Sequence, residues 1–198
     1  VPSVESRGII SESENGNEVT GYTKDANVVY YTAQHSDGST TAVKIAGADP
    51  KSMILLAGLL GWQSQHSAEN YIRYEYAKDA AHVYYAGKIV AGADTVTFRP
   101  IENGRYSHSY GEDGKHVFYE NEIIPGADVN TFEILWSQPH EGCWQAAYAK
   151  DASHVYFDSA LVPGADPATF QALTGDNSYG KDKRGIYLGT QFQPSLPL

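Results

Sequence analysis

The chain has 198 residues, a net charge of −10 and a single cysteine, and 41% of its residues are hydrophobic. This charge argues against a nucleic-acid partner, because phosphate binding requires clustered Lys and Arg, and the few basic residues here are scattered among acids. Cys143 alone cannot form an intramolecular disulfide, and no run of eighteen apolar residues could span a membrane. An acidic surface favours solubility and a basic protein partner.

The first twenty residues are polar, and we expect a lead-in strand at residues 8–10. A motif then begins that recurs along the chain: an opening Tyr, an Asp three residues later, an aliphatic residue seven positions after the Tyr, and an aromatic pair. A Gly-Ala-Asp segment follows. Constant spacing over divergent filler indicates an internal repeat. The copies cover residues 22–56, 76–101, 110–135 and 148–173, with a partial copy at 179–188 and a tail at 189–198 that we expect to be extended or frayed.

Each part of the repeat predicts a local structure. The Asp after the opening Tyr starts a turn, because its short carboxylate can accept backbone N–H groups two residues on. The aliphatic residue and the aromatic pair suit a strand, and the short turn after them predicts a β-hairpin. In the Gly-Ala-Asp segment the Asp occupies a helix N-cap position, with Pro50 or Pro167 next in two copies. We therefore expect a one-turn helix that carries Met53, Phe98, Phe132 or Phe170 into the core.

One repeat is too small to bury its own apolar face, so the copies must pack on one another. The predicted fold is all-β: tandem β-hairpin repeats, each followed by a one-turn helix, stacked in one domain of residues 1–198. The alternative is a small propeller-like closure, although four-stranded blades usually need about 40–50 residues each. The repeat is broken by an insertion at Gln34–Thr40, a long exit at residues 57–73 and a linker at residues 136–147.

Several residues could carry chemistry. His82, His116 and His154 each follow a repeat Asp at the spacing Asp-x-x-His, but stacking places equivalent residues in a ladder, whereas a metal needs three or four ligands around one centre. We therefore expect each His to flank its turn, and no calcium loop pattern is present. Gly142-Cys143-Trp144 resembles a cysteine-protease nucleophile segment only superficially, because a repeat strand follows where a helix is needed. The second ring of each aromatic pair either binds a partner or covers the neighbouring repeat.

The pattern Tyr-x-Lys-Asp-x-x-x-Val-Tyr-Tyr, followed by Gly-Ala-Asp-x-x-Thr-Phe, resembles the bacterial DKNYY repeat family over roughly residues 22–188. The agreement is closest in segments such as Pro163–Asp166, while the Lys-Asn of the family name is largely replaced, as by Ala80-Ala81. The resemblance implies an exported bacterial protein, periplasmic or at the cell surface and often a membrane-anchored lipoprotein, with no assigned activity and no site residues to carry over. The start at Val1 fits a mature exported form.

The favoured hypothesis is a non-catalytic binding protein without a cofactor, whose partner is a protein; an immunity-type protein that neutralises a toxin is one version. The alternative is a carbohydrate- or cell-envelope-binding module, and a hydrolase is the least favoured. The oligomeric state is left open. Segments outside the repeat are under no packing demand and often form the binding face of repeat proteins. The predicted partner-binding residues are therefore His35, Asp37, Trp62, Trp136 and Trp144.

Overall fold

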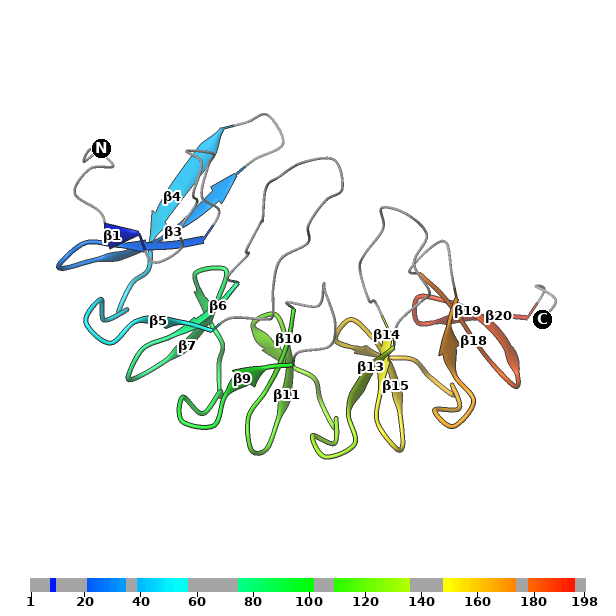
Figure 1. Ribbon diagram of the computed structural model, residues 1–198. Helices are drawn as coiled ribbons and strands as arrows, with labels where there is room; N and C mark the ends of the chain where they lie inside the picture. The colour runs from blue at the N-terminus through cyan, green and yellow to red at the C-terminus, as the bar shows by residue number, and fades with distance from the viewer. Residues whose placement is uncertain are drawn as a thin grey trace, which may run out of the picture. The chain divides into compact units, whose positions relative to one another are not determined.

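The computed structural model describes residues 8–9, 21–34, 39–56, 75–101, 109–135, 148–173 and 178–194. These ranges contain strands and turns and no helix, which confirms the all-β prediction (Figure 1). It follows that no helix in these ranges has the length and apolarity needed to cross a membrane. The chain divides into two compact units, Val1–Gly111 and Glu112–Leu198. That the whole chain forms one domain stays a prediction.

The described strands form five four-stranded antiparallel sheets, none of which closes on itself. The first sheet, β1-β2-β3-β4, consists of Gly8–Ile9, Gly21–Lys24, Val29–Gln34 and Thr40–Lys44. The second, β5-β6-β7-β8, consists of Ile54–Leu55, Tyr76–Lys78, Val83–Tyr85 and Lys88–Ile89. The third has the order β12-β11-β10-β9, with Arg99–Pro100 as β9, Tyr110–Glu112 as β10, Val117–Tyr119 as β11 and Glu122–Ile123 as β12. The fourth, β13-β14-β15-β16, consists of Glu133–Leu135, Tyr148–Lys150, Val155–Phe157 and Ala160–Leu161. The fifth, β17-β18-β19-β20, consists of Gln171–Ala172, Tyr179–Asp182, Gly185–Leu188 and Gln191–Gln193.

The sheets are offset from the sequence repeats. β5 follows the Gly-Ala-Asp segment of the first copy, yet it pairs with β6 of the second copy, with Ile54 opposite Lys78. β13 pairs in the same way with β14, and β17 with β18. Each of these sheets therefore takes its first strand from one repeat and its other three from the next.

The predicted one-turn helix after each hairpin is wrong. In the second copy the N–H of Phe98 donates to the carbonyl of Asp94 at 2.9 Å, which closes one helix-like turn. The Asp94 carboxylate accepts the N–H groups of Val96 and Thr97 at 2.8 and 3.1 Å. The chain then enters β9 at Arg99. The capping Asp is present as expected, but the turn is not continued because the next residues pair in a sheet.

The core contains the opening Tyr and the aliphatic residue of each full copy, among them Val83, Val117 and Val155. Met53, Phe98 and Phe170 are also buried, each with 3% of its surface exposed. The prediction that Phe132 is buried like them is wrong, since this ring is only half-buried.

One sequence difference accompanies the difference in burial. The residue after the opening Tyr of the next copy is Gly111 beside Phe98 and Gly180 beside Phe170, whereas the copy that follows Phe132 has Ala149 at this position. A Cβ at Gly111 would lie 2.5 Å from the Phe98 ring, and one at Gly180 would lie 2.3 Å from the Phe170 ring. We infer from the equivalent positions that the methyl group of Ala149 keeps Phe132 from packing as deeply.

The first and last copies depart from the others. The insertion in the first copy lengthens its hairpin, in which β3 and β4 pair over five residues, whereas β7 and β8 pair over two. In the last copy the expected tail residues Gln191–Gln193 form β20 and pair with β19.

Candidate binding surface

A buried Asp joins neighbouring repeats. In the fourth copy, Oδ1 of Asp151 accepts the N–H groups of Ser153 and His154, both at 2.7 Å, and so closes its own turn. Oδ2 accepts the Tyr156 hydroxyl at 2.8 Å and the N–H of Asp128 at 3.0 Å. Asp128 belongs to the Gly-Ala-Asp turn of the preceding copy, so one carboxylate fixes two repeats to each other.

The same arrangement recurs in both compact units. Asp79 accepts the Tyr84 hydroxyl at 2.8 Å and the N–H of Asp49 at 2.9 Å. Asp182 accepts the Tyr187 hydroxyl at 3.0 Å and the N–H of Asp166, in the preceding copy, at 2.8 Å. In the third copy Phe118 takes the position of this Tyr and offers no hydroxyl. All four of these carboxylates are buried, with 3–5% exposure: Asp79, Asp113, Asp151 and Asp182.

The protonation states at these positions follow from the contacts. Burial alone would raise the pKa of Asp151, but the N–H groups of Asp128, Ser153 and His154 and the Tyr156 hydroxyl together lower it below the ordinary value. Burial, and then the bond to Asp182, raises the pKa of Tyr187 to about 12. At neutral pH the Asp151 carboxylate is ionised and the Tyr187 phenol keeps its proton, as structural hydrogen bonds require.

The three repeat histidines flank their turns. Nδ1 of His82, His116 and His154 lies 3.9, 3.5 and 3.6 Å from the Asp of the same copy, and each side chain is 40–45% exposed. They occur once in each of the second, third and fourth copies. Within the described ranges no group of three or more His, Cys, Asp or Glu side chains is placed to hold a metal ion. Cys143 lies outside those ranges.

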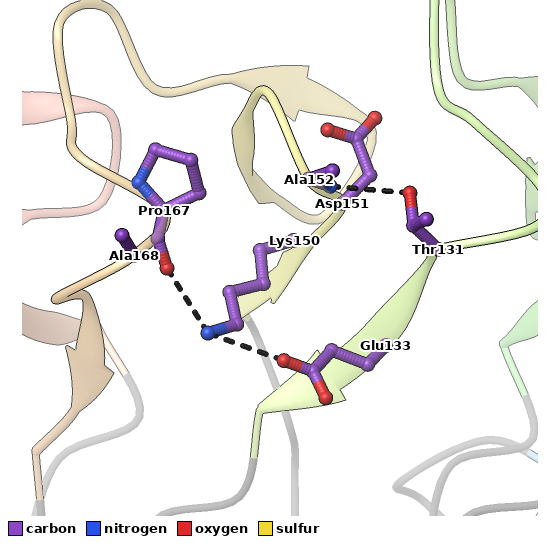
Figure 2. A pocket seen from close by; sticks show the side chains of 7 residues that line it. All are labelled: Thr131, Glu133, Lys150, Asp151, Ala152, Pro167 and Ala168. Carbon is purple, nitrogen blue, oxygen red and sulfur yellow. Dashed lines mark hydrogen bonds and ion pairs between the residues drawn. The ribbon is translucent and has the colours of Figure 1, made fainter.

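A shallow depression of about 220 Å³ marks the junction of the third and fourth copies in the unit Glu112–Leu198 (Figure 2). The Lys150 ammonium donates to the Pro167 carbonyl at 3.0 Å and pairs with Glu133 at 3.1 Å. The Ala152 N–H donates to Oγ1 of Thr131 at 3.1 Å. These polar groups satisfy one another, and Lys24 and Lys78 make the equivalent bond to a turn carbonyl in their own copies. The depression is therefore a repeating structural joint.

The second ring of each aromatic pair covers the neighbouring hairpin. A Cβ at Gly87 would lie 2.7 Å from the side chain of Tyr31, and one at Gly189 would lie 3.7 Å from the Phe157 ring. Tyr85 is itself buried, with 8% of its surface exposed, and its hydroxyl donates to the Glu75 carboxylate at 2.6 Å. Of the two roles that the sequence left open for this position, the structure supports packing.

A family model described as the DKNYY family matches residues 12–160 and 148–195, which together span most of the chain. The chain belongs to the DKNYY family. No curated protein and no solved structure matches it. In this DKNYY chain the Asp and the aromatic pair of the family pattern are the residues that bind one repeat to the next.

The DKNYY chain also exposes one large apolar side chain in the outer strand of each later hairpin. These residues, here called the outer-strand apolar residues, are Ile89, Ile123, Leu161 and Phe192, with exposures of 45%, 37%, 49% and 39%. Each lies directly across from a fully or almost fully buried ring, and the first copy has Lys44 there. One side of each residue covers that ring and the other side faces solvent.

The structure does not test the predicted partner-binding residues, because His35, Asp37, Trp62, Trp136 and Trp144 all lie outside the described ranges. Sequence reasoning missed the outer-strand apolar residues. The signal was the apolar pair after each hairpin turn, such as Ile89-Val90. Successive side chains of a strand point to opposite faces, so the two members of the pair have different neighbours. Val90 is 2% exposed and Ile89 is the outward member.

Proposed function

We propose that this DKNYY chain is a non-catalytic binding protein whose partner is a protein, bound through the outer-strand apolar residues. The observation that carries the proposal is their recurrence. Single exposed apolar residues are common on protein surfaces, but here four hairpins place one at the same half-exposed position. Packing alone does not require a residue as large as Ile, Leu or Phe where so much of its surface faces water.

Three of these residues, Ile123, Leu161 and Phe192, lie in the unit Glu112–Leu198, each on a strand at the end of its sheet. Side chains on end strands are accessible to a partner from the side as well as from above. The exposed Glu122 precedes Ile123, and the whole chain has a net charge of −10. The complementary partner has an apolar patch flanked by basic residues, of which Arg is enriched at protein interfaces.

An exported location agrees with the family resemblance, and an immunity-type protein that neutralises a secreted toxin is one role of this kind. Such a role needs affinity and specificity without chemistry. The polar groups of the repeat join one copy to the next, and one apolar residue of each later hairpin remains accessible. This arrangement can supply affinity and specificity without a catalytic group.

The test is a parallel capture from an envelope and secreted fraction of the native host. Immobilised wild type is compared with the double variant Ile123→Ser/Leu161→Ser and with Val96→Ser, a control at an apolar residue that is 85% exposed and outside the set. We expect a protein that wild type and the control retain and the double variant loses. With the purified partner, the double variant should bind at least about tenfold more weakly.

Two results would overturn the proposal. One is a partner that binds the double variant as tightly as wild type. The other is binding of a glycan panel or peptidoglycan in place of any protein, which would favour the carbohydrate-binding alternative.

A further inference from the structure

The strand β4 is the longest sheet edge in the described part of the chain. In the order β1-β2-β3-β4 it is the end strand, and all five of its side chains, Thr40 to Lys44, are exposed. The end strands of the other described sheets have two or three residues. The insertion in the first copy is what gives β4 this length.

The hydrogen-bond pattern shows which backbone groups of β4 point outward. The N–H of Ile45 donates to the carbonyl of Val29 at 2.9 Å, and the register places these two residues opposite each other. In an antiparallel pair such bonded positions alternate with unbonded ones. Val43 and Thr41 therefore bond to β3, whereas the N–H and C=O groups of Thr40, Ala42 and Lys44 point away from the sheet.

We infer that β4 is a strand-addition site and that its occupant is β4 of a second copy of this chain. An antiparallel pair centred on Ala42 places Thr40 of each copy opposite Lys44 of the second copy, with the two Ala42 residues facing each other. In this register every outward N–H and C=O of the three residues finds a partner. The pairing is isologous, as closed two-fold dimers require.

The side chains of β4 suit this arrangement. Thr, Val and a small Ala fit a pleated surface, and β4 carries a single charge, that of Lys44. The central register keeps the two Lys44 side chains at opposite ends of the strand pair, so no like charges face each other. Proteins commonly protect a long edge with a proline or a charge in the middle of the strand, and β4 has neither.

The dimer is expected to be weak and salt-dependent. Five residues of edge strand bury much less than the roughly 800 Å² per partner of a stable interface. Two chains of net charge −10 repel each other at long range, and salt screens that repulsion. Dimerisation should therefore strengthen as the salt concentration rises, which is the opposite of an association held by ion pairs.

The first test is sedimentation of the full chain up to about 100 μM protein, a range suited to weak interfaces. Wild type should show a dimer fraction that grows with protein and salt concentration. Ala42→Pro removes an outward N–H that β3 does not use, and proline is tolerated on an edge strand in that position. This variant should be monomeric throughout, while the control Ala42→Ser should behave as wild type.

Two charge variants at Thr40 test the register, and this test does not require the Ala42→Pro variant to fold. Thr40→Glu places a carboxylate opposite Lys44 of the second copy, twice per dimer, and should increase the dimer association constant. Thr40→Lys places two ammonium groups there and should decrease it, each by a factor of about 2–10. Monomeric wild type, an Ala42→Pro dimer as strong as wild type, or equal shifts in the two Thr40 variants would each overturn the inference. None of these variants alters the outer-strand apolar residues, so either proposal can fail alone.

Discussion

Two junctions in the unit Glu112–Leu198 are built from the same sequence motif but pack differently. Where the fourth copy meets the last, Phe170 is 3% exposed and its ring centroid lies 5.0 Å from Tyr148 and 5.6 Å from Tyr187. Where the third copy meets the fourth, Phe132 is half-buried and 6.0 Å from Tyr156. Both junctions have the same buried Asp and Tyr hydroxyl. The polar connection is thus constant, whereas the burial of the ring differs, and the residue after the opening Tyr of the next copy is Gly180 at one junction and Ala149 at the other.

The largest expected effect is a difference between the two Phe→Ala variants. Phe170→Ala should lower the free energy of unfolding by about 3–5 kcal/mol, because a fully buried ring leaves a cavity. Phe132→Ala should cost roughly 1–2 kcal/mol, since part of that ring is already in water. Chemical denaturation of the full chain measures both. Equal losses would show that the half-buried ring contributes as much as the buried one.

The second prediction reverses the comparison at one position. Gly180→Ala adds the methyl group that the fourth copy has at Ala149, and it should cost about 1–3 kcal/mol because the new Cβ meets the Phe170 ring. In a double-mutant cycle with Phe170→Ala most of that cost should disappear, because the ring that causes it is gone. A cost that persists without the ring would mean that the glycine is needed for another reason.

The smallest effect concerns the polar connection. Tyr156→Phe removes a hydroxyl that donates to Asp151 and should cost about 1–1.5 kcal/mol at pH 7. The pKa of Asp151 is lowered in the folded state, so its contribution is present above the ordinary value of about 3.9 and is lost as pH falls below it. The difference between wild type and Tyr156→Phe should therefore shrink between about pH 4 and pH 2. Urea unfolding across this range measures it, and a difference unchanged at low pH would exclude the ionised carboxylate as its source.

The sequence was sufficient for the features that depend on local spacing. The hairpins, the capping Asp of each Gly-Ala-Asp turn and the burial of Val83 and Phe98 all follow from residue type and position within one copy. The helix was predicted wrongly because a capped first turn looks the same whether or not a helix follows. Whether a helix follows is decided by the pairing of the next residues with a strand of another copy.

The remaining differences also depend on a second copy. We infer that Ala149, seventeen residues away, limits the depth of Phe132, and the first strand of a sheet is recognised only from its partner strand. The predicted binding residues all lie in segments that interrupt the repeat, whereas Ile123 and Leu161 lie inside it. Each is paired with a residue whose ring is buried, so the residue pattern of one hairpin does not show that it is exposed.

The offset between sheets and sequence repeats has a consequence for dividing the chain. A fragment cut at the start of a sequence motif, for example at Tyr148, would separate β13 from the hairpin that it completes and leave β14 with an unpaired edge. A fragment that keeps its sheet whole must begin no later than Glu133 and continue to Leu161. Fragments, fusions and insertions in DKNYY chains of this kind should therefore take their boundaries from the pairing of strands, because the sequence repeat begins one strand too late.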